Sequence, residues 1–127
     1  MDHETADKLD VIFELQKKLD TDIQERRGLD FPMEQWLQKE VLAMISELAE
    51  LLDEVNFKWW KNEKPIDEPA LHSELVDILH FFISMCWRAG LTSDKLFEGY
   101  IDKNRENFDR QYGRSEKKGY DVTEKDN

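Results

Sequence analysis

Apolar residues recur at three- and four-residue steps in four stretches of this chain. That spacing predicts amphipathic helices over residues 5 to 26, 33 to 60, 70 to 89 and 94 to 112. The intervening segments contain Gly28, the stretch "KPIDEP" and Gly90, which are typical of helix ends and turns. We therefore expect an all-α fold, a bundle of four to five helices.

The apolar faces of the second and third predicted helices indicate extensive burial. The buried stripe expected for the second helix consists of Leu37, Val41, Met44, Ile45, Leu48, Leu52 and Val55. The third helix is apolar on nearly all sides, so other helices or a second subunit must enclose it. Four helices in one chain can hardly cover it completely, and we expect a homodimer.

Polar residues interrupt the third helix along a single line. This seam consists of Glu74, Asp77, Ser84 and Arg88, together with Phe81. Because a buried carboxylate without a partner is strongly unfavourable, Glu74 and Asp77 need a cation, a basic partner or a water-filled cleft.

A second pair of acids, Glu47 and Glu50, flanks the apolar stripe of the second helix about 60° apart. If the second and third helices are antiparallel neighbours, all four carboxylates can face one groove. Two interpretations remain open at this point. The groove holds a divalent cation such as Mg²⁺, or the acids belong to a structural salt-bridge seam with Arg88 or nearby lysines.

Composition limits the remaining possibilities. A chain of 127 residues suits one domain, which we place at residues 1–112, followed by a flexible tail at 113–127. The net charge of −11 argues against nucleic-acid polymers as partners. We expect no membrane partner and a cytoplasmic location, because no apolar run reaches about 18 residues and no signal sequence is visible. The single Cys86 should be a small buried hydrophobe.

Basic, aromatic and amide residues could complete a nucleotide site around such a cation. Candidates for phosphate binding are Lys58, Lys61, Lys103, Arg110 and Tyr120. Candidates for binding a base or sugar are Gln16, Asp20, Trp60, His80, Asn104 and Asn107. For Gln16 and Asp20 two interpretations are open: an edge position in contact with water, or a hydrogen-bonding pair that faces a ligand.

Several segments resemble one known family. "ELAE" at 47–50 followed by "ELVD" at 74–77 is similar to the ExxE and ExxD signature of the all-α, MazG-like nucleoside triphosphate pyrophosphohydrolases. "ELQKKLD" at 14–20, "FKWWK" at 57–61, "ELVDILHF" at 74–81 and "KNRENFDRQYG" at 103–113 resemble the dimeric dUTPase branch of that superfamily. The likeness extends over nearly the whole chain.

The resemblance implies a helical homodimer that hydrolyses dUTP, and dUDP, to dUMP. It thereby implies a role in nucleotide-pool sanitation, the removal of dUTP from the nucleotide pool. It implies Mg²⁺, replaceable by Mn²⁺, bound by Glu47, Glu50, Glu74 and Asp77. It further implies phosphate contacts from Lys61, Lys103, Arg110 and Tyr120, and contacts to uracil and deoxyribose from Gln16, Trp60 and Asn104. Larger members of the branch have Asn near the position of Asp20, where this chain has an acid.

The expected mechanism is metal-assisted hydrolysis of a phosphoanhydride, with Glu50 as the base and Glu47 beside it as the second catalytic carboxylate. One rival is a MazG-like pyrophosphohydrolase of broader specificity with the same site. Another is a noncatalytic helical interaction module whose acids form salt bridges. A di-iron bundle normally needs Glu-x-x-His pairs, and neither acid pair contains a histidine.

Overall fold

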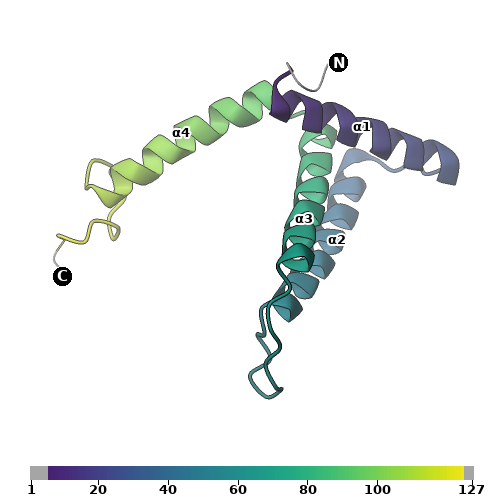
Figure 1. Ribbon diagram of the computed structural model, residues 1–127. Coiled ribbons are helices and arrows are strands. Elements are labelled where there is room, and N and C mark those ends of the chain that lie inside the picture. Colours follow the sequence, from purple (N-terminus) through teal and green to yellow (C-terminus); the bar gives the residue numbers. More distant parts are fainter. Residues whose placement is uncertain (1–5, 125–127) are drawn as a thin grey trace. The chain divides into compact units, whose positions relative to one another are not determined.

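The computed structural model describes residues 6–124, and the described part is all-α, as the sequence predicted. Its four helices are α1 (Lys8–Arg27), α2 (Met33–Glu54), α3 (Glu68–Arg88) and α4 (Ser93–Gln111) (Figure 1). The chain divides into two compact units, one up to Thr92 and the other from Ser93, and each is described by itself. No single helix in the described range is long and apolar enough to cross a membrane.

Local signals in the sequence account for most helix ends. Asp7 caps α1 and Asp67 caps α3, each with a carboxylate that accepts a hydrogen bond of 3.1 Å from the backbone N–H three residues later. Gly28 follows α1 and Gly90 follows α3, with φ angles of 61° and 82°. Glycine adopts this left-handed conformation without steric penalty, so both positions end a helix cleanly.

The second helix is shorter than the sequence predicted, since it ends at Glu54 and not at residue 60. Asn56 has a φ of 58°, a left-handed value with which a right-handed helix cannot continue. Its side chain hydrogen-bonds to the backbone of Lys64, eight residues further on. The aromatic and basic segment that begins at Phe57 is therefore a loop.

The first unit contains α1, α2 and α3, with α3 packed against both of the others. Helices α2 and α3 are antiparallel and are joined by the loop at residues 55–67, whereas α1 crosses the other end of α3 (Figure 1). The buried apolar side chains are Phe13 on α1 and Ile83 and Cys86 on α3. Cys86 is thus buried as predicted, and burial raises the pKa of its thiol.

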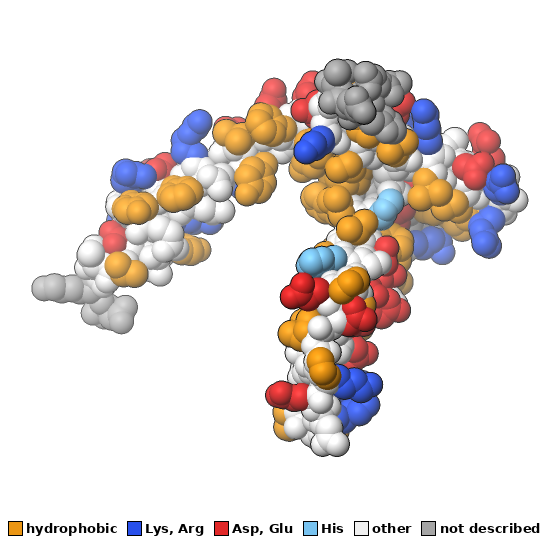
Figure 2. Space-filling view, in the orientation of Figure 1, with side chains coloured by type: hydrophobic (Ala, Val, Ile, Leu, Met, Phe, Trp, Pro, Cys, Tyr) orange, Lys and Arg blue, Asp and Glu red, His pale blue; other side chains and the backbone are white. Residues whose placement is uncertain are grey.

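The predicted apolar stripe of α2 is largely exposed in the single chain, which corrects the expectation of burial. Exposed positions of this stripe are Val41, Ile45, Leu48, Leu52 and Val55. The neighbouring α3 likewise exposes Leu75, Val76, Leu79 and Phe82. Side chains of this kind lie over much of the visible surface (Figure 2). Helix α3 packs against α1 and α2, and each helix buries the face that it turns towards its neighbour. Within the described part of this unit, no further helix covers the opposite faces.

The second unit consists of α4 and the segment that follows it. The side chains of Phe97, Tyr100 and Phe108 on α4 are exposed within this unit. The segment after α4 folds back locally, because Ser115 donates a hydrogen bond of 2.7 Å to Glu106 on the helix. The flexibility expected for residues 113–127 stays a prediction, and residues 125–127 lie outside the described range.

Candidate active site

Three of the four predicted carboxylates meet between α2 and α3. Glu47 and Glu50 project from α2, and Glu74 projects from α3. One oxygen of each carboxylate lies within 4.8 Å of an oxygen of the other two. The three-residue spacing on α2 places both acids on one face, and the antiparallel packing of α3 brings Glu74 opposite them.

The electrostatic environment of this cluster is unfavourable without a cation. The Oε2 atoms of Glu47 and Glu74 are buried and have no hydrogen-bond partner. Within the described residues, no Lys, Arg or His side chain forms an ion pair with any of the three acids. The close contact with the Glu47 carboxyl group, together with burial and the charge of Glu50, raises the pKa of Glu74 to about 7.

These features fit a hard divalent cation. Mg²⁺ prefers oxygen ligands and is commonly bound by a few carboxylates, with water or substrate oxygens completing its shell. The unpartnered oxygens of Glu47 and Glu74 are suitable ligands in type and position. Asp77, the fourth predicted ligand, lies one turn further along α3, half-buried and outside the group of three.

At its C-terminal end, the predicted polar seam on α3 contacts a different acid of α2, outside the carboxylate cluster. Arg88 forms an ion pair with Glu40 of α2 at 3.2 Å, and both side chains are at least nine-tenths buried. The Arg88 guanidinium group also donates a hydrogen bond of 2.9 Å to Gln24 and stacks on Trp36 at 3.9 Å. Arg88 thus balances a charge at this end of α3, and the salt-bridge interpretation applies here and not at Glu74.

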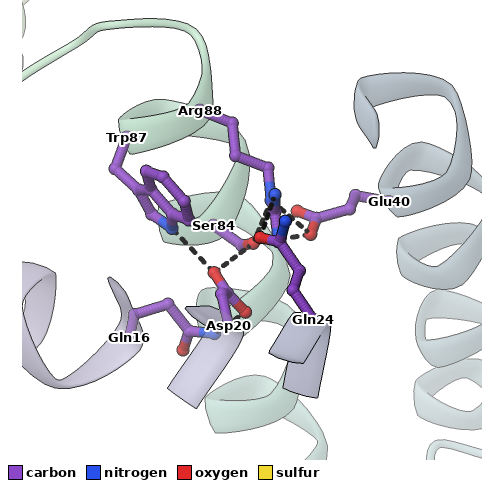
Figure 3. A network of polar contacts seen from close by, with 7 residues as sticks. All are labelled: Gln16, Asp20, Gln24, Glu40, Ser84, Trp87 and Arg88. Carbon is purple, nitrogen blue, oxygen red and sulfur yellow. Dashed lines mark hydrogen bonds and ion pairs between the residues drawn. The ribbon is translucent and has the colours of Figure 1, made fainter. Parts of the chain in front are cut away.

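Ser84 joins two acids in the same buried network (Figure 3). Its hydroxyl oxygen lies 2.6 Å from Asp20 and 2.6 Å from Glu40, while Trp87 donates a hydrogen bond of 2.7 Å to Asp20. One hydroxyl proton can serve only one acceptor at a time, so Asp20 and Glu40 share the Ser84 hydroxyl group. Burial raises the pKa of Glu40, although the Ser84 hydroxyl and the Arg88 guanidinium group act in the opposite direction.

Gln16 and Asp20 form a buried hydrogen-bonded pair. The Gln16 amide nitrogen donates a hydrogen bond of 2.9 Å to Asp20, and its oxygen accepts one from Nδ1 of His80. Gln16 is 6% exposed and Asp20 is 7% exposed. The structure thereby excludes the edge position in contact with water and brings three candidates for base binding together.

The predicted lysines at the end of α2 line a cavity. Lys58 and Lys61 belong to the loop that follows α2, and this cavity has a volume of about 250 Å³. Lys58 forms an ion pair of 3.4 Å with Asp53. Trp60 packs edge to face against Trp59 with ring centroids 4.7 Å apart, and its side chain is exposed.

The other predicted residues lie in the second unit. Arg110 forms an ion pair of 3.1 Å with Glu106, and its guanidinium group lies over the ring of Tyr120 at 5.6 Å. Asn104 and Asn107 line a separate cavity near the end of α4. Lys103 is exposed on the same helix.

Sequence reasoning missed Glu40. It lies in the polar stretch "LQKE", which is typical of a solvated helix face, and nothing in that stretch indicates a buried acid. The available signal was its position seven residues before Glu47, because two helical turns place both on one face of α2.

Comparison with known proteins agrees with the class that the fold and site define, an all-α protein with a carboxylate cluster on an antiparallel helix pair. A family model described as dUTPase matches residues 8–89, which span α1 to α3, and the chain belongs to this family. No solved structure gave a significant match.

Two curated relatives are similar over part of their length. The dCTP pyrophosphatase of Enterobacteria phage T4 is 33% identical over 87 residues, covering 58% of this chain and 51% of that protein. The dCTP pyrophosphatase of Enterobacteria phage LZ5 is 31% identical over 74 residues, covering 58% of this chain and 43% of that protein. The chain thus spans about half the length of these relatives or less.

Proposed function

We propose that this protein is a metal-dependent nucleotide pyrophosphohydrolase that converts dUTP, and dUDP, to dUMP. The observation that carries the proposal is the cluster of Glu47, Glu50 and Glu74, whose charges no basic side chain in the described range balances. Membership of the dUTPase family and the relatives named dCTP pyrophosphatase favour nucleotide hydrolysis over a noncatalytic interaction module.

Glu47, Glu50 and Glu74 would hold Mg²⁺, or Mn²⁺ in its place, with Asp77 in reach from the next turn of α3. When bound, the cation would neutralise the phosphate oxygens and fix their orientation. The chain offers Mg²⁺ only oxygen ligands here, in keeping with the preference of that ion.

The side chains supply the remaining chemistry. Glu50 is the more exposed of the two α2 acids, and it accepts the proton of the attacking water. Lys58 and Lys61, from the loop beyond α2, stabilise negative charge on the phosphate chain. Lys103, Arg110 and Tyr120, which belong to the second unit, are also proposed phosphate contacts.

For the base of the substrate, there are alternatives to uracil. Gln16, Asp20, His80, Trp60, Asn104 and Asn107 are the proposed base and sugar contacts. An alternative substrate is dCTP, which the names of the two phage relatives favour. A MazG-like enzyme of broader specificity is the second alternative.

The proposal includes a homodimer. Large apolar side chains on α2 and α3 remain exposed in the single chain, among them Leu42 at 67%, Ile45 at 55% and Val76 at 53%. Exposed apolar surface on this scale marks an interaction surface, and a second copy would supply the missing layer.

Product analysis with a nucleotide panel tests the activity. We expect release of dUMP and pyrophosphate from dUTP with Mg²⁺, and no release when EDTA removes the metal. Turnover of dCTP in preference to dUTP would replace the substrate and keep the reaction. No turnover of any deoxy- or ribonucleoside triphosphate with Mg²⁺ or Mn²⁺ would favour the interaction module.

A further inference from the structure

Asn56 joins the two ends of the loop beyond α2. Its amide nitrogen donates a hydrogen bond of 2.8 Å to the carbonyl oxygen of Lys64, and its amide oxygen accepts one of 2.9 Å from the Lys64 backbone N–H. Both backbone groups of one residue are thus bound by one side chain. This paired contact, here called the Asn56 clasp, closes residues 57–63 into a ring.

The backbone of Asn56 is adapted to this role. Its φ of 58° makes it the non-glycine residue with a left-handed conformation in the described range. Asparagine tolerates that conformation better than most residues, and its short amide can pair with a nearby backbone. The position therefore requires both a left-handed backbone and an amide side chain.

The closed loop collects positive charge around one cavity. Lys58, Lys61 and Lys64 all line the space of about 250 Å³, and Asp53 is the acid that lines it. The Asp53 carboxylate forms its ion pair with Lys58, whereas Lys61 and Lys64 form no ion pair with any described residue. The cavity thus has two lysines without an anionic partner.

The cavity also adjoins the carboxylate cluster. Asp53 follows Glu50 by three residues on α2, which is a rise of about 4.5 Å along the helix axis. Figure 2 shows acidic side chains along the α2–α3 pair and lysines gathered near its loop end. A ligand with a chain of negative charges, held at one end by a cation between the acids, could extend into the lysines.

We propose that Asn56 is a positioning residue for an oligophosphate, and that its clasp holds Lys64 beside Lys58 and Lys61 as a three-lysine cradle. The inference deepens the proposed function and rests on it for the nature of the substrate. Asn56 also lines the cavity, but its amide nitrogen and its amide oxygen are both hydrogen-bonded to Lys64. It acts through the backbone of Lys64, which would otherwise move with a thirteen-residue loop between α2 and α3.

Titration calorimetry with inorganic pyrophosphate in EDTA tests the cradle without any turnover. We expect Lys64→Gln to weaken binding about tenfold, as expected for loss of one charge-assisted contact, and Asn56→Gly to weaken it about fivefold. Glycine keeps the left-handed backbone accessible, so Asn56→Gly removes the clasp with little strain. Lys18→Gln, which removes a lysine charge from α1, should bind like the wild type.

A double-mutant cycle separates positioning from a general loss of stability. If Asn56 acts through Lys64, Asn56→Gly should weaken binding much less in a Lys64→Gln background than alone. In turnover assays both single variants should raise KM for the nucleotide about as much as they weaken pyrophosphate binding, with kcat unchanged.

Two results would overturn the inference: wild-type protein that binds no pyrophosphate, or an Asn56→Gly effect that is fully additive to Lys64→Gln. These outcomes are independent of catalysis. Pyrophosphate binding can fail while the enzyme still hydrolyses nucleotides, and hydrolysis can be absent while the cradle binds pyrophosphate.

Discussion

At the scale of single residues, Glu74 determines how the candidate site responds to pH. Its folded-state pKa of about 7 exceeds the ordinary value of 4.5, so the folded protein binds a proton more tightly than the unfolded chain. The stability that this group contributes is complete below pH 4.5 and is lost as the pH rises towards 7. As the pH rises from 4.5 to about 7, the melting temperature of the metal-free wild type should therefore fall relative to that of Glu74→Gln.

The same proton competes with the proposed metal. Below pH 7 the apparent affinity for Mg²⁺ should fall by up to about tenfold per pH unit, since protonated Glu74 is a poor ligand. Calorimetric titrations with Mg²⁺ between pH 5.5 and 8.5 measure this slope. Affinity that does not change over the range, or melting curves of wild type and Glu74→Gln that run parallel, would contradict the assignment.

Glu50 is the residue on which the proposed chemistry depends most. Replacing it by Gln removes the proton acceptor but keeps the shape of the side chain, and we expect kcat to fall by about 10²- to 10⁴-fold. Nucleotide binding in the presence of Mg²⁺ should be weakened much less than kcat, because Glu47 and Glu74 remain. Steady-state and binding measurements on the same sample check both; a variant with wild-type kcat would remove Glu50 from its role as base.

The sequence pattern predicted the clustered acids better than it predicted the residues around them. Glu47, Glu50 and Glu74 stood out because acids in apolar helices are expensive to bury, and the structure brings them together. Glu40 and Asn56 did not stand out. The first looks like an exposed helix residue, and the second acquires its role only when the loop returns Lys64 to it.

At the scale of elements, the buried network around Arg88 joins α1, α2 and α3. Arg88→Met would leave Glu40 buried with no basic partner, and we expect it to lower the free energy of unfolding by about 3 kcal/mol. Arg26→Met provides the matched control, since Arg26 forms an exposed ion pair with Asp22 on α1.

Urea denaturation of the two variants tests this prediction. The Arg26→Met change should stay within about 0.5 kcal/mol, the size usual for an exposed pair. Equal effects of the two substitutions would show that Arg88 does not hold the three helices together. Arg88→Met combined with Glu40→Leu should recover part of the loss, because it removes the buried charge that Arg88 leaves behind.

Helix positions were predictable because periodicity and caps are local properties of the sequence. The predicted ranges agree closely with α1, α3 and α4, where Asp7, Asp67 and the glycines act within a few residues. The predicted end of α2 was wrong because a contact with Lys64 stabilises the left-handed conformation of Asn56. No short stretch of sequence reveals that contact.

At the scale of the whole molecule, the apolar stripe of α2 was recognisable but its partner was not. The spacing of Val41, Ile45 and Leu48 indicates burial, yet these side chains are exposed within the chain. We predict that light scattering at micromolar concentration gives twice the mass of one chain, because a second copy covers this surface. A monomer at that concentration would contradict the homodimer.

We propose that the three glutamates hold the divalent cations through which the protein binds its nucleotide. Calorimetric titration with a nonhydrolysable dUTP analogue and Mg²⁺ together tests it most directly, with the Glu47→Gln, Glu50→Gln, Glu74→Gln triple variant as control. We expect metal-dependent binding to the wild type, which EDTA abolishes and which the triple variant lacks. Absence of binding by the wild type to this analogue and to its dCTP counterpart, or equal binding by the triple variant, would contradict it.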